Sequence, residues 1–99
     1  MTTALTLTTD SRPDGLQLTA VGEIDMSNAE IFANALTAAV AEADGERLVV
    51  DLTGVQYLDS AGLAALFAQA AHLQVRTGPL IAPLLEVSGL ADLTTVEHA

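Results

Sequence analysis

The apolar residues of this chain repeat with two different periods, two residues in some segments and about 3.6 in others. Leu5 and Leu7, and later Leu16 and Leu18, alternate with polar residues, which predicts two strands with one buried face each. The segment Arg12-Pro13-Asp14-Gly15 between them favours a tight turn, because Pro fixes φ and Gly accepts a positive φ. The chain is therefore expected to begin with a β-hairpin.

A helix is expected after the second strand. Ser27 and Glu30 have the spacing of a capping box, in which each side chain satisfies a backbone donor at the helix start. The helix is predicted to run to about Glu42, with Asp44-Gly45-Glu46 ending it. The apolar residues that share one stripe of this helix are Phe32, Leu36, Ala39, Val40 and Ala43.

A short apolar run over 48–52 comes next. It is β-rich and stands between two helical patterns, which predicts an interior strand parallel to a neighbour. A loop over 53–58 is expected to lead to Asp59 and Ser60, with Ser60 at the N-cap of a second helix. The inward residues of that helix are predicted to be Leu63, Leu66, Phe67 and Ala70.

The segment after Ala71 has two interpretations. Either a strand occupies 73–75, or the helix continues to Arg76 and a strand follows over 79–82. We prefer the second, because the glycine of Thr77-Gly78 is typical of the position after a helix. Downstream, Pro83 predicts a short helix over 84–87 that Gly89 closes, and a last strand is expected within 93–96.

Length and charge restrict the function classes. A chain of 99 residues with 51% hydrophobic residues predicts one folded domain, and the absence of cysteine excludes disulfides and thiol chemistry. Thirteen acidic residues against three basic ones give a net charge of −10, which disfavours nucleic acid and anionic membrane surfaces. The acidity suits a basic protein partner or serves solubility alone. The sequence shows neither a signal peptide nor an apolar run that would span a bilayer, so we expect a cytoplasmic protein.

Three segments together resemble a known family. They are Gly22-Glu23-Ile24-Asp25, the run 49–52 with Asp59-Ser60-Ala61-Gly62-Leu63, and Leu84 to Leu90. In this order and spacing they resemble the STAS domain of bacterial anti-sigma-factor antagonists over nearly the whole chain. The resemblance implies a single α/β domain over 1–99, with a mixed four- to five-stranded sheet and helices packed mainly on one face. From about residue 77 the chain looks shortened relative to the family.

The same resemblance implies a function. In the family, the unphosphorylated antagonist binds an anti-sigma factor that is also a serine kinase, and this frees the sigma factor. Phosphorylation of the serine after the Asp ends the interaction, and a PP2C-type phosphatase restores it. Ser60 occupies that position, so the chain is expected to be a regulatory module and not an enzyme, with no cofactor and no metal. The expected partner contacts are Asp25, Tyr57, Leu58, Asp59, Ala61 and Gly62.

The local sequence leaves other interpretations open for these residues. Ser60 could serve only as an N-cap, which is worth about 1 kcal/mol. Tyr57 and Leu58 could fold into the core or remain as partner contacts. Asp25 could be a turn residue, and Gly62 could only permit close packing.

Other functions also remain open. A STAS scaffold subunit of a stressosome or of a lipid-transport ATPase assembly would need no phosphorylation. A small hydrolase using Ser60 would need a base that the sequence does not identify, since His72 and His98 have no recognisable spacing to it or to each other. A shortened C-terminal helix that leaves apolar surface open would favour a weak homodimer.

Overall fold

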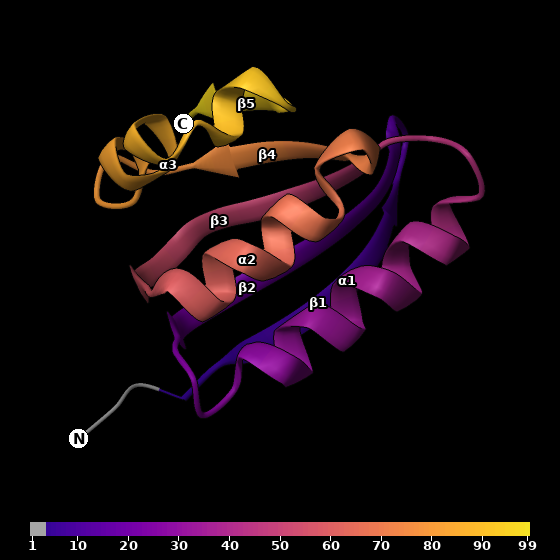
Figure 1. Ribbon diagram of the computed structural model, residues 1–99. Coiled ribbons are helices and arrows are strands. Elements are labelled where there is room, and N and C mark those ends of the chain that lie inside the picture. Colours follow the sequence, from indigo (N-terminus) through magenta and orange to yellow (C-terminus); the bar gives the residue numbers. More distant parts are fainter. Residues whose placement is uncertain (1–3) are drawn as a thin grey trace.

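The structure, a computed structural model, describes residues 4–99, which form a five-stranded sheet and three α-helices. The strands are β1 (Thr6–Arg12), β2 (Gly15–Ile24), β3 (Leu48–Leu58), β4 (Leu73–Thr77) and β5 (Thr95–His98). The helices are α1 (Ala29–Ala43), α2 (Ser60–Ala68) and α3 (Ala82–Ser88), with 3-10 turns η1 (Ala70–His72) and η2 (Leu90–Asp92). The strands lie in sequence order, β1 antiparallel to β2 and all later neighbours parallel (Figure 1).

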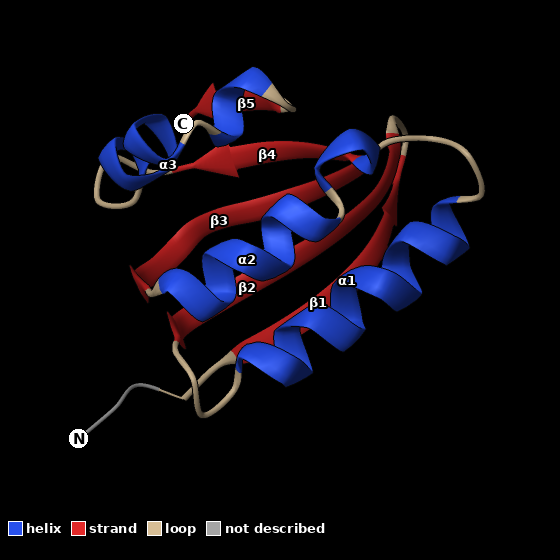
Figure 2. Cartoon of the chain, in the orientation of Figure 1, coloured by secondary structure: helices blue, strands red, loops and turns tan. Residues whose placement is uncertain are grey.

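This order explains why the helices gather on one side. Parallel neighbours require crossover connections, and those connections are almost always right-handed. Because the strand order never reverses, successive right-handed crossovers return over the same face of the sheet. Helices α1 and α2 accordingly cover one face (Figure 2). The mixed five-stranded sheet with helices mainly on one face is confirmed.

The N-terminal hairpin forms as predicted. Arg12 pairs with Gly15 across the turn, and Gly15 has a φ of +127°, a value that glycine adopts without strain. Further along, Thr8 pairs with Thr19, and both lie on the sheet face that α1 and α2 leave uncovered. The opposite face of β2 supplies buried residues, including Leu18 and Ile24.

The strand predicted over 48–52 is confirmed, but it continues to Leu58, so the loop expected over 53–58 is wrong. The pairing with β2 shifts twice: Thr19 pairs with Asp51 but Val21 pairs with Gly54, and a second shift follows Gly22. Such bulges let a strand continue while its inward and outward alternation changes phase. Because the alternation of inward and outward residues is interrupted over 53–58, the sequence pattern of this segment is typical of a loop.

The preferred interpretation of the segment after Ala71 is also wrong. Helix α2 ends at Ala68, and the strand is β4 over 73–77, not 79–82. Leu73 pairs with Leu48 and Val75 with Val50, and all four side chains are almost completely buried. Burial of these aliphatic groups in the sheet decides the structure, whereas the helix-ending glycine was only a local signal.

The C-terminal segment follows the prediction more closely. Helix α3 has Pro83 in its first turn, and Gly89 ends it with a φ of +85°. The last strand exists but spans 95–98 rather than 93–96. It completes the sheet by pairing Val96 with Val75 of β4.

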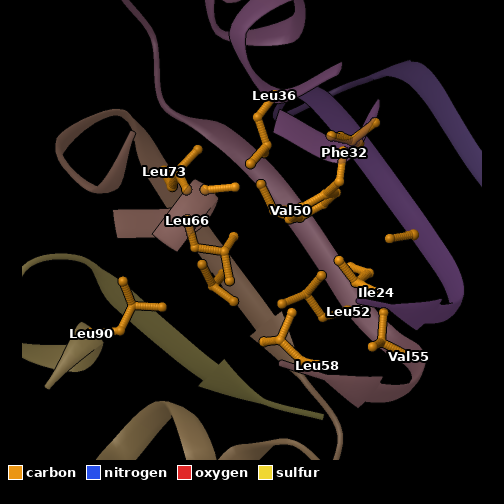
Figure 3. Packing of buried hydrophobic residues seen from close by; sticks show 14 of the residues in the cluster. Ile24, Phe32, Leu36, Val50, Leu52, Val55, Leu58, Leu66, Leu73 and Leu90 are labelled. Atoms are coloured by element: carbon orange, nitrogen blue, oxygen red, sulfur yellow. The ribbon is translucent and has the colours of Figure 1, made fainter. Parts of the chain in front are cut away.

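The core lies between the sheet and its helices. Phe32 and Leu36 from α1 and Leu66 from α2 are fully buried against the sheet (Figure 3). Ala39 of the predicted α1 stripe is also buried, while Val40 and Ala43 are only partly buried. This apolar packing fixes α1 and α2 on β2 and β3, and thereby positions the segments that precede each helix.

Candidate functional site

The residues expected to contact a partner come from two segments that meet at one end of the sheet. Strands β2 and β3 run in parallel and finish at the same end, where α1 and α2 begin (Figure 1). The backbone N–H of Asp59 donates a hydrogen bond to the carbonyl oxygen of Ile24 at 3.1 Å. This bond brings the turn after β2 beside the start of α2. The carboxyl ends of parallel strands are where α/β proteins usually place their functional residues.

Asp59, and not Ser60, is the N-cap of α2. Its carboxylate accepts hydrogen bonds from the backbone N–H groups of Ala61 at 2.9 Å and Gly62 at 3.1 Å. Its backbone is extended, with φ −94° and ψ −175°, as a cap residue requires. The prediction that Ser60 occupies the N-cap is therefore wrong by one residue, because the Asp carboxylate takes the first free amides of the helix.

Because Asp59 caps α2, the hydroxyl of Ser60 is not needed to stabilise the helix start. Ser60 is the first residue of α2 and is exposed. Within residues 4–99, no hydrogen bond engages its side chain. The interpretation of Ser60 as only an N-cap is therefore wrong, and its hydroxyl is exposed to solvent.

The turn between β2 and α1 is held by its own side chains. Asp25 Oδ1 accepts hydrogen bonds from the hydroxyl of Ser27 and from its backbone N–H, the latter at 2.8 Å. Asn28 Oδ1 accepts from the backbone N–H of Asp25 at 3.0 Å, and Asn28 Nδ2 donates to the carbonyl of Glu23 at 2.9 Å. These bonds make the turn 25–28 a pre-organised loop.

The capping box expected from Ser27 and Glu30 does not form. The N-cap of α1 is Asn28, and no side chain caps the first turn. Ser27 instead bonds to Asp25, and those bonds lower the pKa of the Asp25 carboxyl below its ordinary value of 3.8. The hydroxyl of Ser27 is the largest cause, followed by its backbone N–H. Asp25 is therefore held as a carboxylate beside the start of α2.

Apolar side chains stand exposed around this turn. Met26 at its tip is 84% exposed, Ile31 in the first turn of α1 is 61% exposed and Tyr57 on β3 is 50% exposed. Tyr57 pairs in register with Glu23, which places it beside the strand that leads into the turn. Sequence reasoning identified Tyr57 but missed Met26 and Ile31. The available signal was that Met26 is apolar within a polar turn and that Ile31 lies outside the buried stripe of α1.

Two of the expected contact residues lie inside the molecule. Leu58 is 4% exposed and packs in the core (Figure 3), and Gly62 is buried as well. A Cβ on Gly62 would lie 2.5 Å from Leu58 Cδ1 and 2.7 Å from Ile24 Cγ2, both far too close. Leu58 and Gly62 therefore support the surface from beneath. The predicted site residues that are fully or partly exposed at this end of the sheet are Asp25, Tyr57, Asp59, Ser60 and Ala61.

The two histidines lie elsewhere. His72 ends η1, beyond the far end of α2 from Ser60, and His98 Nε2 lies 3.6 Å from Glu86 Oε1. Over residues 4–99 there is no pocket and no cluster of His, Asp and Glu side chains that could hold a metal ion. No helix in that range is both long and apolar enough to cross a bilayer.

Two solved structures show the same fold over nearly the whole chain. An anti-sigma factor antagonist from Mycobacterium paratuberculosis matches with a TM-score of 0.85 and 27% identity, covering 95% of this chain and 86% of that one. The anti-sigma factor antagonist SpoIIAA in its unphosphorylated form matches with a TM-score of 0.73 and 14% identity, covering 97% and 88%. No match was found among curated protein sequences.

A family model described as "Mlab, STAS domain" matches residues 7–95. That range contains all five strands except the first residue of β1 and the last three of β5. It also contains the turn 25–28 and the start of α2. The chain therefore belongs to the STAS domain family.

Proposed function

We propose that this chain is an anti-sigma-factor antagonist controlled by phosphorylation of Ser60. In its unphosphorylated form it binds an anti-sigma serine kinase in the cytoplasm and frees the sigma factor. Phosphorylation by that kinase ends the interaction, and a PP2C-type phosphatase restores it. The 27% identity with a structurally matching antagonist supports the general role.

The observation that carries the switch is the free hydroxyl of Ser60. A capping serine would be held against the helix start, and its phosphorylation would remove a structural bond. Here Asp59 performs the capping and Ser60 remains exposed. A kinase can therefore modify Ser60 while the helix start keeps its cap.

The surroundings of Ser60 explain why a phosphate would change the surface without refolding it. Phosphorylation adds a charge of about −1.5 to −2. The nearby amides of Ala61 and Gly62 already bond to the Asp59 carboxylate, which itself is negative. Of the three arginines, Arg12 lies at the hairpin turn and Arg47 just before β3, both at the opposite end of the sheet. The third, Arg76, is on β4 and pairs with Asp51, seven residues before the end of β3 (58 − 51 = 7). The added charge would therefore meet acidic neighbours and stay exposed.

The partner surface that we propose combines apolar contacts with acidic ones. Met26 and Tyr57 supply exposed apolar area, and side chains of this kind frequently anchor interfaces. Asp25 and Asp59 lie beside them and suit basic groups on the kinase. A phosphate on Ser60 would have to lose its water to remain within such an interface, which costs binding energy.

The direct test is phosphorylation in vitro. The purified chain is incubated with ATP and anti-sigma serine kinases from its source organism, and intact mass is then measured. We expect one added phosphate, lost in the Ser60→Ala variant and kept in Ser27→Ala, which removes a second serine at the same end of the sheet. Full modification of Ser60→Ala would refute the site assignment.

A second test measures binding. The affinities of the phosphorylated chain and of the unphosphorylated chain for the same kinase are compared by titration calorimetry. Phosphorylated protein should bind at least about tenfold more weakly, since like charges and desolvation of the phosphate both oppose association. Equal affinities would contradict a switch based on charge.

One observation favours a second candidate function. The matching family model is described as Mlab and not as an antagonist. In this alternative the chain is a scaffold subunit of a larger STAS assembly, such as a lipid-transport ATPase or a stressosome, and Ser60 stays unmodified. Protein isolated from its native cells would then carry no phosphate, and it would co-purify with a transporter ATPase or other STAS subunits instead of a kinase.

A further inference from the structure

A second exposed apolar surface lies on α3 and its flanking turns, which we call the α3 patch. It comprises Leu80, Leu84, Val87 and Leu93, which are 66%, 37%, 88% and 56% exposed. The first three are spaced four and three residues apart, so they project from one side of a helical segment. Helical geometry already begins before α3, because the N–H of Ala82 donates to the carbonyl of Gly78.

The side chains of the α3 patch are not part of the hydrophobic core. Ile81, Ala82 and Leu85 are the residues by which this segment packs on the core, and each is almost completely buried. The α3 patch faces the other way. A helix that is apolar on its inner and outer sides is normally covered on both, and exposed apolar groups that gather in one place mark interaction sites.

The charges around the α3 patch determine what could cover it. Glu86 lies on α3, Asp92 lies on η2, which packs against α3, and the Asp92 carboxylate is near Gly89 at the end of α3. From residue 77 to residue 99 the sequence holds no Lys or Arg. His98 lies beside Glu86, with its Nε2 3.6 Å from Glu86 Oε1, on a chain whose net charge is −10. α3 and η2 therefore contribute only acidic groups around the patch, while Arg47, which donates to Thr95 Oγ1 at 3.2 Å, lies at the start of β5.

A second copy of this chain would bring the same acidic rim and the same net charge. Like charges placed face to face oppose association. An anionic membrane is disfavoured for the same reason. The complementary occupant has an apolar stripe flanked by basic groups.

We propose that the α3 patch docks an amphipathic helix of a partner protein, with Lys or Arg on both sides of its apolar stripe. The inference goes beyond the Ser60 switch and does not depend on it. Ser88, the one hydroxyl residue within α3, is engaged: its Oγ donates to the carbonyl of Leu85 at 2.8 Å and accepts from the N–H of Leu90 at 3.3 Å. Ser60 lies at the start of α2, outside the α3 patch, so docking on the patch should not depend on the phosphorylation state of Ser60.

Three synthetic peptides of about 18 residues, long enough for a stable isolated helix, test the proposal on the unmodified chain. The first carries a Leu stripe flanked by Lys. The second has the same composition in a scrambled order without a stripe, and the third has Glu in place of Lys. Affinity is measured by fluorescence anisotropy at low and high salt, and the site is mapped by amide chemical shifts.

We expect the striped basic peptide to bind most tightly, with shift changes centred on 80–93 and weaker binding at high salt. Val87→Gln and Leu80→Gln should each weaken it about tenfold, since an apolar side chain buried on binding is lost. Ile31→Gln, which changes an exposed apolar residue on α1, outside the α3 patch, should leave the affinity unchanged. All three side chains are exposed, so the variants should fold.

Four outcomes would overturn the proposal. The scrambled peptide could bind as tightly as the striped one, or Ile31→Gln could weaken binding as much as Val87→Gln. Sedimentation could reveal a dimer that Val87→Gln dissociates, which would make a second copy the occupant. Binding of the chain to lipid vesicles, lost in Val87→Gln, would make a membrane the occupant.

Discussion

The backbone N–H of Asp59 donates to the carbonyl oxygen of Ile24 at 3.1 Å, and this bond joins the start of α2 to the end of β2. Asp25 is the next residue after Ile24, and Ser60 is the next after Asp59. Two short segments that are 34 residues apart in the sequence therefore share one end of the sheet (59 − 25 = 34). The candidate site depends on this junction, and its parts can be tested separately.

The roles of Asp59 and Ser60 can be separated by two alanine variants. Asp59→Ala should lower the free energy of unfolding by about 1 kcal/mol, because two amides of α2 lose their cap. Ser60→Ala should change it by less than about 0.5 kcal/mol, as an exposed substitution without a bonding role does. Urea denaturation measures both. A larger loss in Ser60→Ala than in Asp59→Ala would return the capping role to Ser60.

The Asp25 carboxyl should respond to loss of the Ser27 hydroxyl. The bonds from Ser27 lower the pKa of Asp25, so Ser27→Ala should raise it toward 3.8, as followed by NMR titration of the carboxyl carbon. A pKa that is lower in the folded state stabilises the protein at pH values above 3.8, and this contribution is lost as the pH falls through the folded value. Ser27→Ala should thus lose stability relative to wild type near neutral pH and lose less of it in acid.

An Asp25→Asn variant is the control for that experiment. It has no carboxyl to titrate at this position, so adding Ser27→Ala to it should produce a stability difference that does not vary with pH over the same range. A pH-dependent difference in this background would show that another group is responsible.

Gly62→Ala should be destabilising although alanine favours helices. The new Cβ would lie 2.5 Å from Leu58 Cδ1 and 2.7 Å from Ile24 Cγ2. Overpacking costs about 1–3 kcal/mol, and alanine regains about 1 kcal/mol of helix propensity. We expect a net loss of about 1 kcal/mol in urea denaturation.

A double-mutant cycle with Leu58→Val identifies the cause. Valine lacks the Cδ1 atom, so Leu58→Val should cost less in the Gly62→Ala background than in wild type. Additive effects of the two substitutions would mean that steric contact with Leu58 is not the origin of the loss.

Met26 is expected to act in binding and not in folding. Met26→Ser removes an 84% exposed side chain, so stability should stay within about 0.5 kcal/mol of wild type. Affinity for the partner kinase should fall about tenfold if Met26 is buried in the complex. Val21→Thr, an exposed and nearly isosteric change on β2, is the matched control and should leave affinity unchanged. Equal affinity for Met26→Ser and wild type would remove Met26 from the interface.

Alternating and helical periodicity were enough to predict the hairpin, α1, the inner part of β3 and the existence of α2, while Pro83 and Gly89 predicted α3. These segments each follow one period over several residues. The turn residues were also informative, since Gly15 and Gly89 adopt the positive φ that their positions predicted.

The errors arise where a tertiary contact overrides a local signal. The bulges in β3 disrupt the alternation over 53–58, and only pairing with β2 shows that the strand continues. Thr77-Gly78 resembled a helix end, but burial of Leu73 and Val75 beside β3 places a strand there. At both helix starts the predicted serine cap was wrong. The Asp59 carboxylate takes the first amides of α2, and at α1 the Asp25 carboxylate instead binds the hydroxyl and the backbone N–H of Ser27.

The direction of the strands also governs where the chain can be modified for experiments. Thr6 pairs with Val21, so the first strand starts near the end of the sheet that holds Asp25 and Ser60. His98 pairs with Thr77, and the neighbouring Arg76 pairs with Asp51, seven residues before the end of β3 (58 − 51 = 7), so the last strand finishes well short of that end. The hairpin turn at Pro13 and Asp14 lies at the other end, about 30 Å away along the ten residues of β2. A fluorophore or affinity tag attached just before β1 would crowd the candidate interface, whereas one attached after β5 or inserted at the hairpin turn would leave it accessible.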